Sequence, residues 1–171
     1  MKAVSLKRAV LTLSLFSVLN ASAGLLRDEE APAEPKEESA VLLPAAPKRD
    51  ALLRYEVSAT SSMRFELDPT SITIVDGDTV RFTSVITSPS GVSNVSYEGI
   101  RCKSAERKLY ASGRADSSWN AFPDAAWRQI SSAGSNSYHA TLFKDFFCDG
   151  SAVAGKVPAI VERLKRNKPI R

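Results

Sequence analysis

Hydrophobic and polar residues alternate through the middle of the chain in the pattern typical of antiparallel strands. The run Met63–Asp68 has this period of two, and so do residues 78–87. Between them, the Asp76-Gly77 step predicts a hairpin, because glycine accepts the positive φ of a type I′ turn. The predicted core face of the second run carries Val80, Phe82, Ser84 and Ile86.

Turn residues and short apolar runs divide the rest of this region into further strands. Asp68–Ser71 (DPTS) is a predicted turn, followed by a short strand at Ile72–Val75 that is rich in β-branched residues. More strands are predicted at Val92–Tyr97, with Ile100–Lys103 as its continuation after a break at Gly99, and at Lys108–Ser112.

The last third of the chain contains the helix candidates. Ser137–Phe147 fits a strand or a helix, with helix favoured in its second half, and Val157–Lys165 is a predicted helix with one apolar face. Together these elements predict an α+β fold. Its centre is a β-rich antiparallel meander of five or six strands, accompanied by one or two short helices.

The first 23 residues have the composition of a secretory signal peptide. Basic residues precede an apolar stretch of 11 residues, Ala9–Leu19, and the small residues of Asn20–Ala23 follow. The apolar stretch is shorter than the about 20 residues that span a bilayer. We therefore predict cleavage after Ala23, export to the periplasm and a mature chain without a transmembrane span.

Residues 24–50 have the composition of a linker. The segment is rich in alanine, proline and glutamate, lacks aromatic residues and has seven acids against four bases. Such a segment does not bury enough apolar surface to offset its ordering entropy. We predict a disordered linker over 24–50 and one globular β-rich domain over 51–171. The alternative for the linker is a partner-docking segment with Val41-Leu42-Leu43 as its anchor.

Removal of the leader changes the charge balance. The full chain has a net charge of +4, and loss of three leader bases leaves 20 Lys+Arg against 19 Asp+Glu, or +1. Strong nucleic-acid binding needs a concentrated basic face, so no nucleic-acid partner is expected. The basic C-terminus is interpreted as a solvated tail, with contact to anionic lipid headgroups or cell-wall polymers as the alternative. Its basic residues are Arg163, Lys165, Arg166, Lys168 and Arg171.

The chain has two cysteines, Cys102 and Cys148. An even count in an exported chain predicts one disulfide. Neither cysteine belongs to a C-x-x-C motif, so redox activity is not expected. Two cysteines and a single histidine do not make a metal site, and no phosphate-binding or dinucleotide motif is present. We therefore expect no cofactor.

His139 is the one histidine in the sequence. A catalytic role would need a nucleophile and an orienting acid beside it. Ser137 and Asp145 are candidates by composition only, and no G-x-S-x-G elbow frames a serine. The favoured interpretation of His139 is a surface or half-buried side chain.

Two segments that end in the cysteines carry a family resemblance: Asn94–Cys102 (NVSYEGIRC) and Asp145–Cys148 (DFFC). With other short motifs, they resemble the cryptic neisserial protein-like family over Met63–Cys148. The resemblance implies an exported protein of Gram-negative bacteria with a domain of unknown function, and no catalytic residue carries over from it. The other matching motifs are Arg81–Thr83, Ser88–Gly91, Lys108–Ala111, Trp127-Arg128 and Tyr138–Ala140.

Two hypotheses for the function follow. The first is a non-catalytic periplasmic or envelope-associated module that binds a protein, lipid or glycan partner. Exposed aromatic side chains anchor interfaces, whereas buried ones pack the core. The contact candidates are Tyr97, Trp119, Phe122 and Trp127. The second hypothesis is a small hydrolase-like enzyme that uses His139 with a nearby acid or serine.

Overall fold

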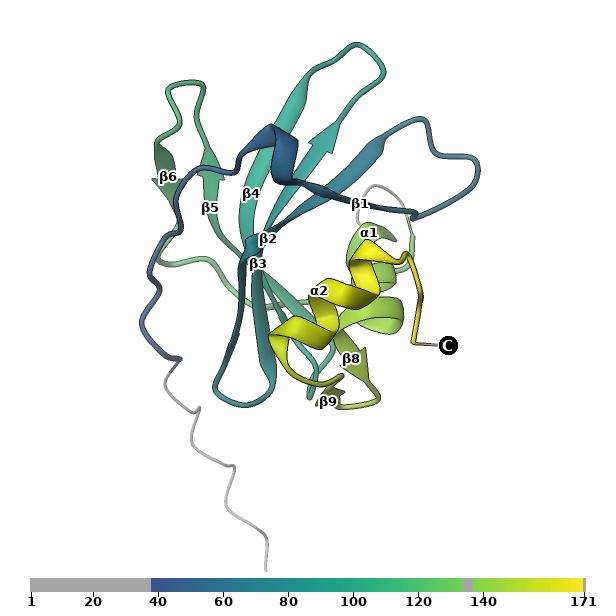
Figure 1. Cartoon of the computed structure of the whole chain (residues 1–171). Helices are drawn as coiled ribbons and strands as arrows, with labels where there is room; N and C mark the ends of the chain where they lie inside the picture. Colours follow the sequence, from purple (N-terminus) through teal and green to yellow (C-terminus); the bar gives the residue numbers. More distant parts are fainter. Residues whose placement is uncertain (1–37, 134–136, 171) are drawn as a thin grey trace, which may run out of the picture. The chain divides into compact units, whose positions relative to one another are not determined.

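Six consecutive strands form one antiparallel sheet. The computed structural model describes residues 38–133 and 137–170, so the predicted signal peptide and residues 24–37 of the predicted linker lie outside the described residues. Figure 1 shows the meander, whose neighbouring strands are also neighbours in the sequence. The strands are β1 (Leu53–Tyr55), β2 (Arg64–Val75), β3 (Thr79–Thr87), β4 (Ser93–Arg101), β5 (Glu106–Gly113) and β6 (Trp119–Ala121), and β7 (Arg128–Gln129) also pairs with β5.

Helices cover one face of this sheet, which we call the inner face. The helix α1 (Ser137–Thr141) continues into the π-helical turn η3 (Leu142–Phe147), and α2 (Val157–Lys165) follows the small hairpin of β8 (Cys148–Asp149) and β9 (Ala152–Val153). The predicted α+β fold, with its antiparallel meander and two short helices, is confirmed. None of the helices in the described residues is long and apolar enough to cross a membrane.

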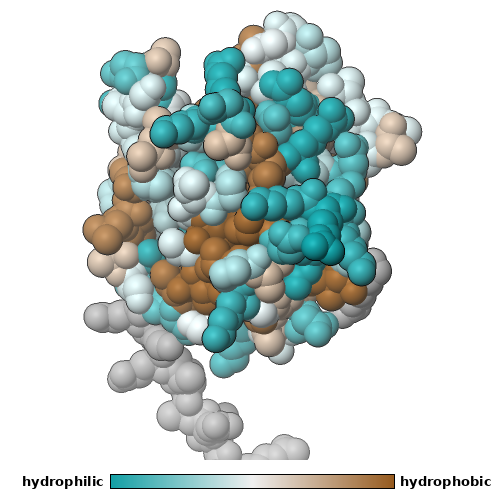
Figure 2. Space-filling view, viewed as in Figure 1, coloured by the Kyte–Doolittle hydropathy of each residue, from teal (hydrophilic) through white to brown (hydrophobic). Residues whose placement is uncertain are grey.

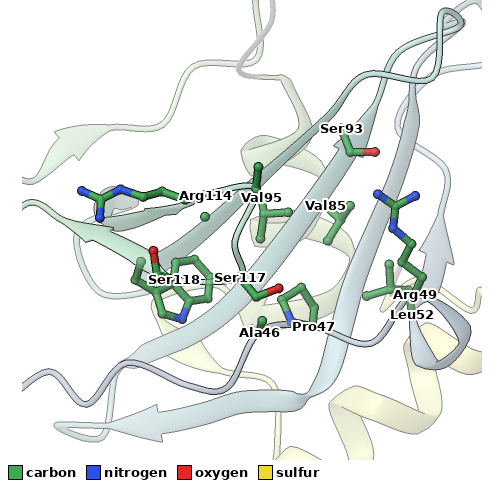
Figure 3. A pocket seen from close by; sticks show the side chains of 13 residues that line it. Ala46, Pro47, Arg49, Leu52, Val85, Ser93, Val95, Arg114, Ser117 and Ser118 are labelled. Carbon is green, nitrogen blue, oxygen red and sulfur yellow. The ribbon is translucent and has the colours of Figure 1, made fainter.

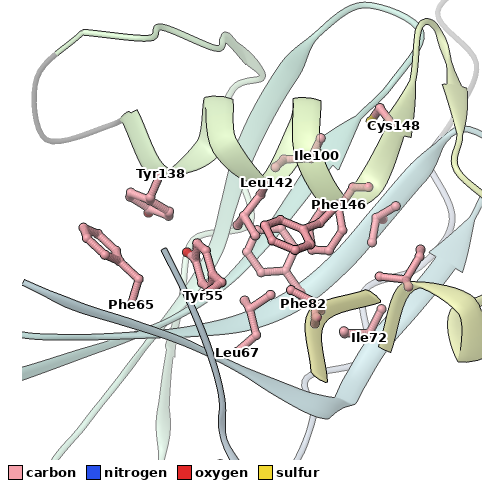
Figure 4. Packing of buried hydrophobic residues seen from close by; sticks show 14 of the residues in the cluster. Tyr55, Phe65, Leu67, Ile72, Phe82, Ile100, Tyr138, Leu142, Phe146 and Cys148 are labelled. Carbon is pink, nitrogen blue, oxygen red and sulfur yellow. The ribbon is translucent and has the colours of Figure 1, made fainter. Parts of the chain in front are cut away.

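The main core lies between the inner face and the helices, as Figure 4 shows. Phe82 of β3 packs against Phe147 with ring centroids 5.0 Å apart, and Phe65 stacks on Tyr138 at 6.0 Å. From α2, the side chains of Ile160 and Leu164 are fully buried. Burial of each contributes about 1.5–3 kcal/mol, so the predicted apolar face of this helix holds it to the sheet.

Strand β2 is longer than predicted, because the expected turn at Asp68–Ser71 is a bulge within it. The pairing of β2 with β3 shifts between Asp68 and Thr73. Pro69 has no N–H for the ladder. The Ser71 hydroxyl accepts the Thr83 N–H at 2.7 Å and donates to the Asp68 carbonyl at 2.8 Å. A side chain therefore replaces a missing backbone partner, and the strand continues.

The hairpin between β2 and β3 is confirmed. Asp76 and Gly77 have φ values of 55° and 80°, the left-handed conformation that a type I′ turn requires. Beyond the hairpin, the sheet keeps the predicted core face of β3, because Val80 and Phe82 are fully buried against the helices.

Contacts with the sheet begin at Glu38, before the expected start of the domain at Ala51. Residues 38–50, predicted as part of a disordered linker, instead run along the sheet face opposite the helices, and this is a correction. We call residues Glu38–Pro47 the strap and the face that it follows the outer face. In Figure 1 the strap is the dark-blue segment beside β5 and β6. Composition missed this contact because the strap is held by polar groups.

The basic C-terminus is partly built into the fold. The Arg163 guanidinium donates to the carbonyl oxygens of Phe146 at 2.6 Å and Ala154 at 3.0 Å. Lys165, Arg166 and Lys168 are exposed. Because Arg163 binds a carbonyl oxygen at the end of η3, it does not belong to a solvated tail. Arg171 lies outside the described residues.

A disulfide joins Cys102 to Cys148, as predicted, with the two Cα atoms 5.5 Å apart. It ties the residue after β4 to the first residue of β8, across 46 positions of sequence. The bond therefore fastens η3 and the helical layer to the sheet.

Replacing both cysteines with serine is expected to lower the free energy of unfolding by about 4 kcal/mol, because the unfolded chain regains the entropy of a loop this long. Urea unfolding of the oxidised chain and of the double variant, followed by circular dichroism, measures the difference. Addition of a reductant should destabilise only the parent chain. An equal stability of the two chains would contradict the prediction.

Candidate functional site

A second aromatic cluster lies on the outer face, separate from the main core. Tyr97 of β4 and Tyr110 of β5 are buried with ring centroids 5.6 Å apart. Trp119 lies 6.3 Å from Tyr97, and Trp127 meets Tyr110 edge-on at 6.3 Å. The cluster positions the hydroxyl and indole groups that contact the strap.

Gly99 of β4 leaves room for the Tyr110 ring. A Cβ atom at this position would lie 2.8 Å from both Cε2 and the hydroxyl oxygen of Tyr110, and 3.2 Å from the Trp127 ring. Strand β4 runs through Gly99, so the predicted break there is wrong. The glycine serves a close approach of side chains and does not end the strand.

The strap begins with a carboxylate that three side chains of the sheet hold. Arg81 Nη2 lies 3.2 Å and Lys108 Nζ 2.9 Å from the two carboxylate oxygens of Glu38, and the Tyr110 hydroxyl donates to it as well. We call Arg81, Lys108 and Tyr110 the carboxylate clamp. The Arg81 side chain is only 3% exposed, so its charge depends on this partner.

The electrostatics of the clamp favour an ionised ligand. Partial burial alone would raise the pKa of Glu38, but the hydrogen bonds from Tyr110 and Lys108 and the Lys108 charge outweigh it and lower this pKa. Burial and the hydrogen bond to Glu38 raise the pKa of Tyr110, so its hydroxyl remains a donor. The clamp therefore holds a carboxylate in its charged form.

The next residues of the strap are held mainly through their backbone. Arg81 donates to the carbonyl oxygens of Ser39 at 2.5 Å and Ala40 at 2.9 Å. Asp76, in the β2–β3 hairpin, accepts the Ser39 N–H at 3.2 Å and its hydroxyl at 2.5 Å. Further along, the Trp119 indole donates to the Pro44 carbonyl at 2.7 Å. Side chains of the sheet thus bind mainly backbone groups of the strap, and a separate extended peptide would offer the same groups.

Beyond Pro44 the strap forms one wall of a pocket of about 430 Å³, which we call the hairpin pocket. Figure 3 shows Val85 and Val95 on the strands between the Arg49 and Arg114 side chains. The other residues that line it are Ala46, Pro47, Leu52, Ser93, Gly113, Ala115, Ser117, Ser118 and Trp119.

The four predicted contact residues differ in burial and in what they contact. Tyr97 is buried in the outer-face cluster, whereas Trp119 and Trp127 are half-buried at its edge. Trp119 also lines the hairpin pocket and bonds the strap. Phe122 is half-buried on the loop after β6. None of the four is a fully exposed aromatic anchor, and Trp119 is the one that reaches both the pocket and the strap.

The inner face holds a second buried carboxylate. Glu98 of β4 accepts hydrogen bonds from His139 Nε2, from the Ser96 hydroxyl and from the Tyr138 hydroxyl at 2.9 Å. Burial alone would raise the pKa of Glu98, but these donors and the His139 charge lower it. The prediction that His139 lies at or near the surface is wrong, because it is 1% exposed.

This inner pair has the residue types of a catalytic dyad without access to a substrate. Glu98 is 2% exposed, and His139 Nδ1 has no hydrogen-bond partner among the described residues. A hydrolytic triad would place a nucleophile on the histidine nitrogen that faces away from the acid. The geometry fits a structural tie between α1 and β4 better than a reaction centre.

Sequence reasoning missed both carboxylates. Glu98 stands two residues before Ile100, so strand alternation places it on the core face, and that signal was available. Glu38 carried no comparable signal, because it lies among other acids in a segment of linker composition. Among the described residues, no group of three or more His, Cys, Asp or Glu side chains is arranged to hold a metal ion.

Comparison with known proteins gives one match. The model described as the CNP1-like family matches residues 31–165, more than half of the chain, and the matched range includes the whole strap. Neither the search of curated proteins nor the search of solved structures found a match.

Replacing Glu98 with glutamine is expected to lower stability at neutral pH by about 3 kcal/mol, because buried donors lose their charged partner. A lowered carboxyl pKa stabilises the fold fully above the unfolded value of about 4.3, and this contribution is lost as pH falls through the folded pKa. Chemical unfolding from pH 7 to pH 3 should therefore show the variant and the parent converging in acid.

The exposed Glu162 of α2 is the matched control, because its side chain is 52% exposed. The Glu162→Gln variant should follow the parent at every pH. A stability difference between parent and Glu98→Gln that stays constant down to pH 3 would contradict the assigned role of Glu98.

Proposed function

The chain belongs to the CNP1-like family, and from this premise we propose that it is an exported, non-catalytic binding module of the bacterial envelope. Its ligand-binding surface is the outer face of the sheet, where the hairpin pocket and the carboxylate clamp lie along the same strap. The alternative that the sequence left open, a hydrolase built on His139, has less support.

The hairpin pocket is the observation that carries this proposal. At about 430 Å³ it is within the range of small-ligand sites, and it combines apolar walls with a few polar groups, as such sites do. Val85 and Val95 form its apolar part, and Arg49 and Arg114 flank them (Figure 3). This composition favours a ligand that presents an apolar portion together with an anionic group.

The inner-face dyad supports a binding function by contrast. Its His139 contacts an acid, as a hydrolase would require, but His139 on α1 and Glu98 on β4 are both buried where the helix packs on the sheet. A substrate would reach them only if the helix left the sheet. A catalytic base must come within about 3 Å of the proton that it abstracts, and this burial prevents such an approach in the folded state.

Export is supported by two independent features. The disulfide between Cys102 and Cys148 is of a kind that persists in oxidising compartments such as the periplasm. The predicted leader, cleaved after Ala23, would deliver the chain there. The work of the domain is therefore proposed to lie in the envelope, where its partner is a protein, lipid or glycan.

Site-specific photo-crosslinking in bacterial cells that carry the protein tests the proposal. A crosslinking amino acid in place of Ala115, which is exposed and lines the hairpin pocket, should give one dominant adduct of defined mass. The same amino acid in place of Lys165, exposed on α2, is the control and should not give this adduct. An absence of adducts at Ala115, or an identical pattern at both positions, would refute the pocket as the binding site.

A further inference from the structure

The first residues of the strap are bound through groups that any extended acidic peptide carries. The clamp holds the Glu38 carboxylate, and Arg81 also holds the backbone carbonyls of Ser39 and Ala40. The strap has no regular secondary structure from Glu38 to Pro47. Its recognition therefore depends on one carboxylate and on peptide oxygens, and hardly on the identity of the side chains that follow.

The clamp itself is a permanent part of the sheet. Arg81 projects from the central strand β3 and Lys108 from β5, with side chains 3% and 14% exposed. The centroid of the Tyr110 ring lies 5.0 Å from the Arg81 guanidinium and 5.4 Å from the Lys108 ammonium, so the ring helps to hold both cations in place. Two confined cations beside one hydroxyl require an anion whenever they are shielded from water.

The strap is a weakly packed occupant of this site. Leu42 is 83% exposed and Val41 and Leu43 are each 39% exposed, so none of these apolar side chains is fully buried. Figure 2 shows apolar surface at the left of the molecule, the side along which the strap runs in Figure 1. A segment with few buried apolar contacts opens at low free energy compared with the core.

We propose that the carboxylate clamp is a binding site for an extended, acidic peptide segment of a partner protein, and that the strap is its intramolecular ligand in the free protein. This inference rests on the proposed binding function of the outer face. A tethered ligand acts at an effective concentration in the millimolar range, so it keeps weak anions out of the clamp. A partner that also fills the hairpin pocket, at the other end of the strap, gains contacts that compensate for this competition.

A capped, fluorescently labelled peptide with the sequence of residues 37–47 tests the proposal by anisotropy. It should bind the full chain carrying Glu38→Gln about tenfold more tightly than the parent chain, because the competing strap has lost its charge. The chain carrying Leu42→Ala is the matched control, since that side chain points to solvent, and it should bind the peptide like the parent.

Two variant peptides and one double variant of the chain keep the test specific for the clamp. A peptide with glutamine in place of Glu38 should bind about tenfold more weakly, whereas glutamine in place of Glu37 removes the same charge and should leave the affinity unchanged. In the chain, Glu38→Gln combined with Lys108→Gln should lose the gain in affinity. Near-ultraviolet circular dichroism verifies that each chain is folded.

Three results would overturn the proposal. One is equal peptide affinity in the Glu38→Gln and Leu42→Ala chains, and another is a gain that survives the Lys108 substitution. The third is a parent chain that sediments as a dimer while Glu38→Gln is monomeric, since the strap would then be exchanged between copies. Failure here leaves the hairpin pocket to its own test at Ala115, so the two proposals are judged separately.

Discussion

The central strand β3 has to be covered on both faces, and the rest of the structure depends on this constraint. Eight of its nine residues are buried. On the inner face Phe82 requires an apolar cover, which the helices supply and the disulfide at Cys148 holds in place. On the outer face the buried Arg81 requires an anion and hydrogen-bond acceptors, which the strap supplies. One strand therefore demands two covers of opposite chemistry.

The two covers explain why similar polar groups have different roles on the two faces. Glu98 and Glu38 are both carboxylates whose pKa is lowered by the donors around them. Two partners of Glu98, Tyr138 and His139, belong to α1, which is packed in the main core, so their separation from Glu98 requires loss of tertiary structure. Glu38 belongs to a segment that local motion can release without disturbing the sheet. The inner carboxylate stabilises the fold, and the outer one marks a site that another ligand can occupy.

Much of the sheet followed from local pattern, because a half-buried strand leaves a period of two in the sequence. The hairpin at Asp76-Gly77 and the helix over Val157–Lys165 were predictable for the same reason, since turn geometry and an apolar face are local properties. The bulge in β2 was not, because its Ser71 hydroxyl acts on an N–H that is 12 residues away in sequence. Local turn residues look the same whether a strand ends or bulges.

The candidate site was less predictable than the fold. Trp119 was found as an aromatic contact candidate, but Arg81 alternates with the predicted core residues Val80 and Phe82, and the sequence carried no sign that its face of the strand is covered. The contacts of Glu38 with Arg81 and Lys108 span 43 and 70 positions. The pattern of hydrophobic residues in the sequence does not reveal such contacts, because charged groups anchor the strap and Leu42 remains exposed to solvent.

The sequence by itself determined the strand order, the C-terminal helix, the pairing of two cysteines and the family. These properties follow from periodicity, composition and short motifs, which are features of neighbouring residues or simple residue counts. Tertiary structure alone decided that residues 38–47 cover the sheet and that Glu98 and His139 meet in the core. The physical reason is that a charge specifies its partner by position in space, and the sheet brings those positions together only once it has folded.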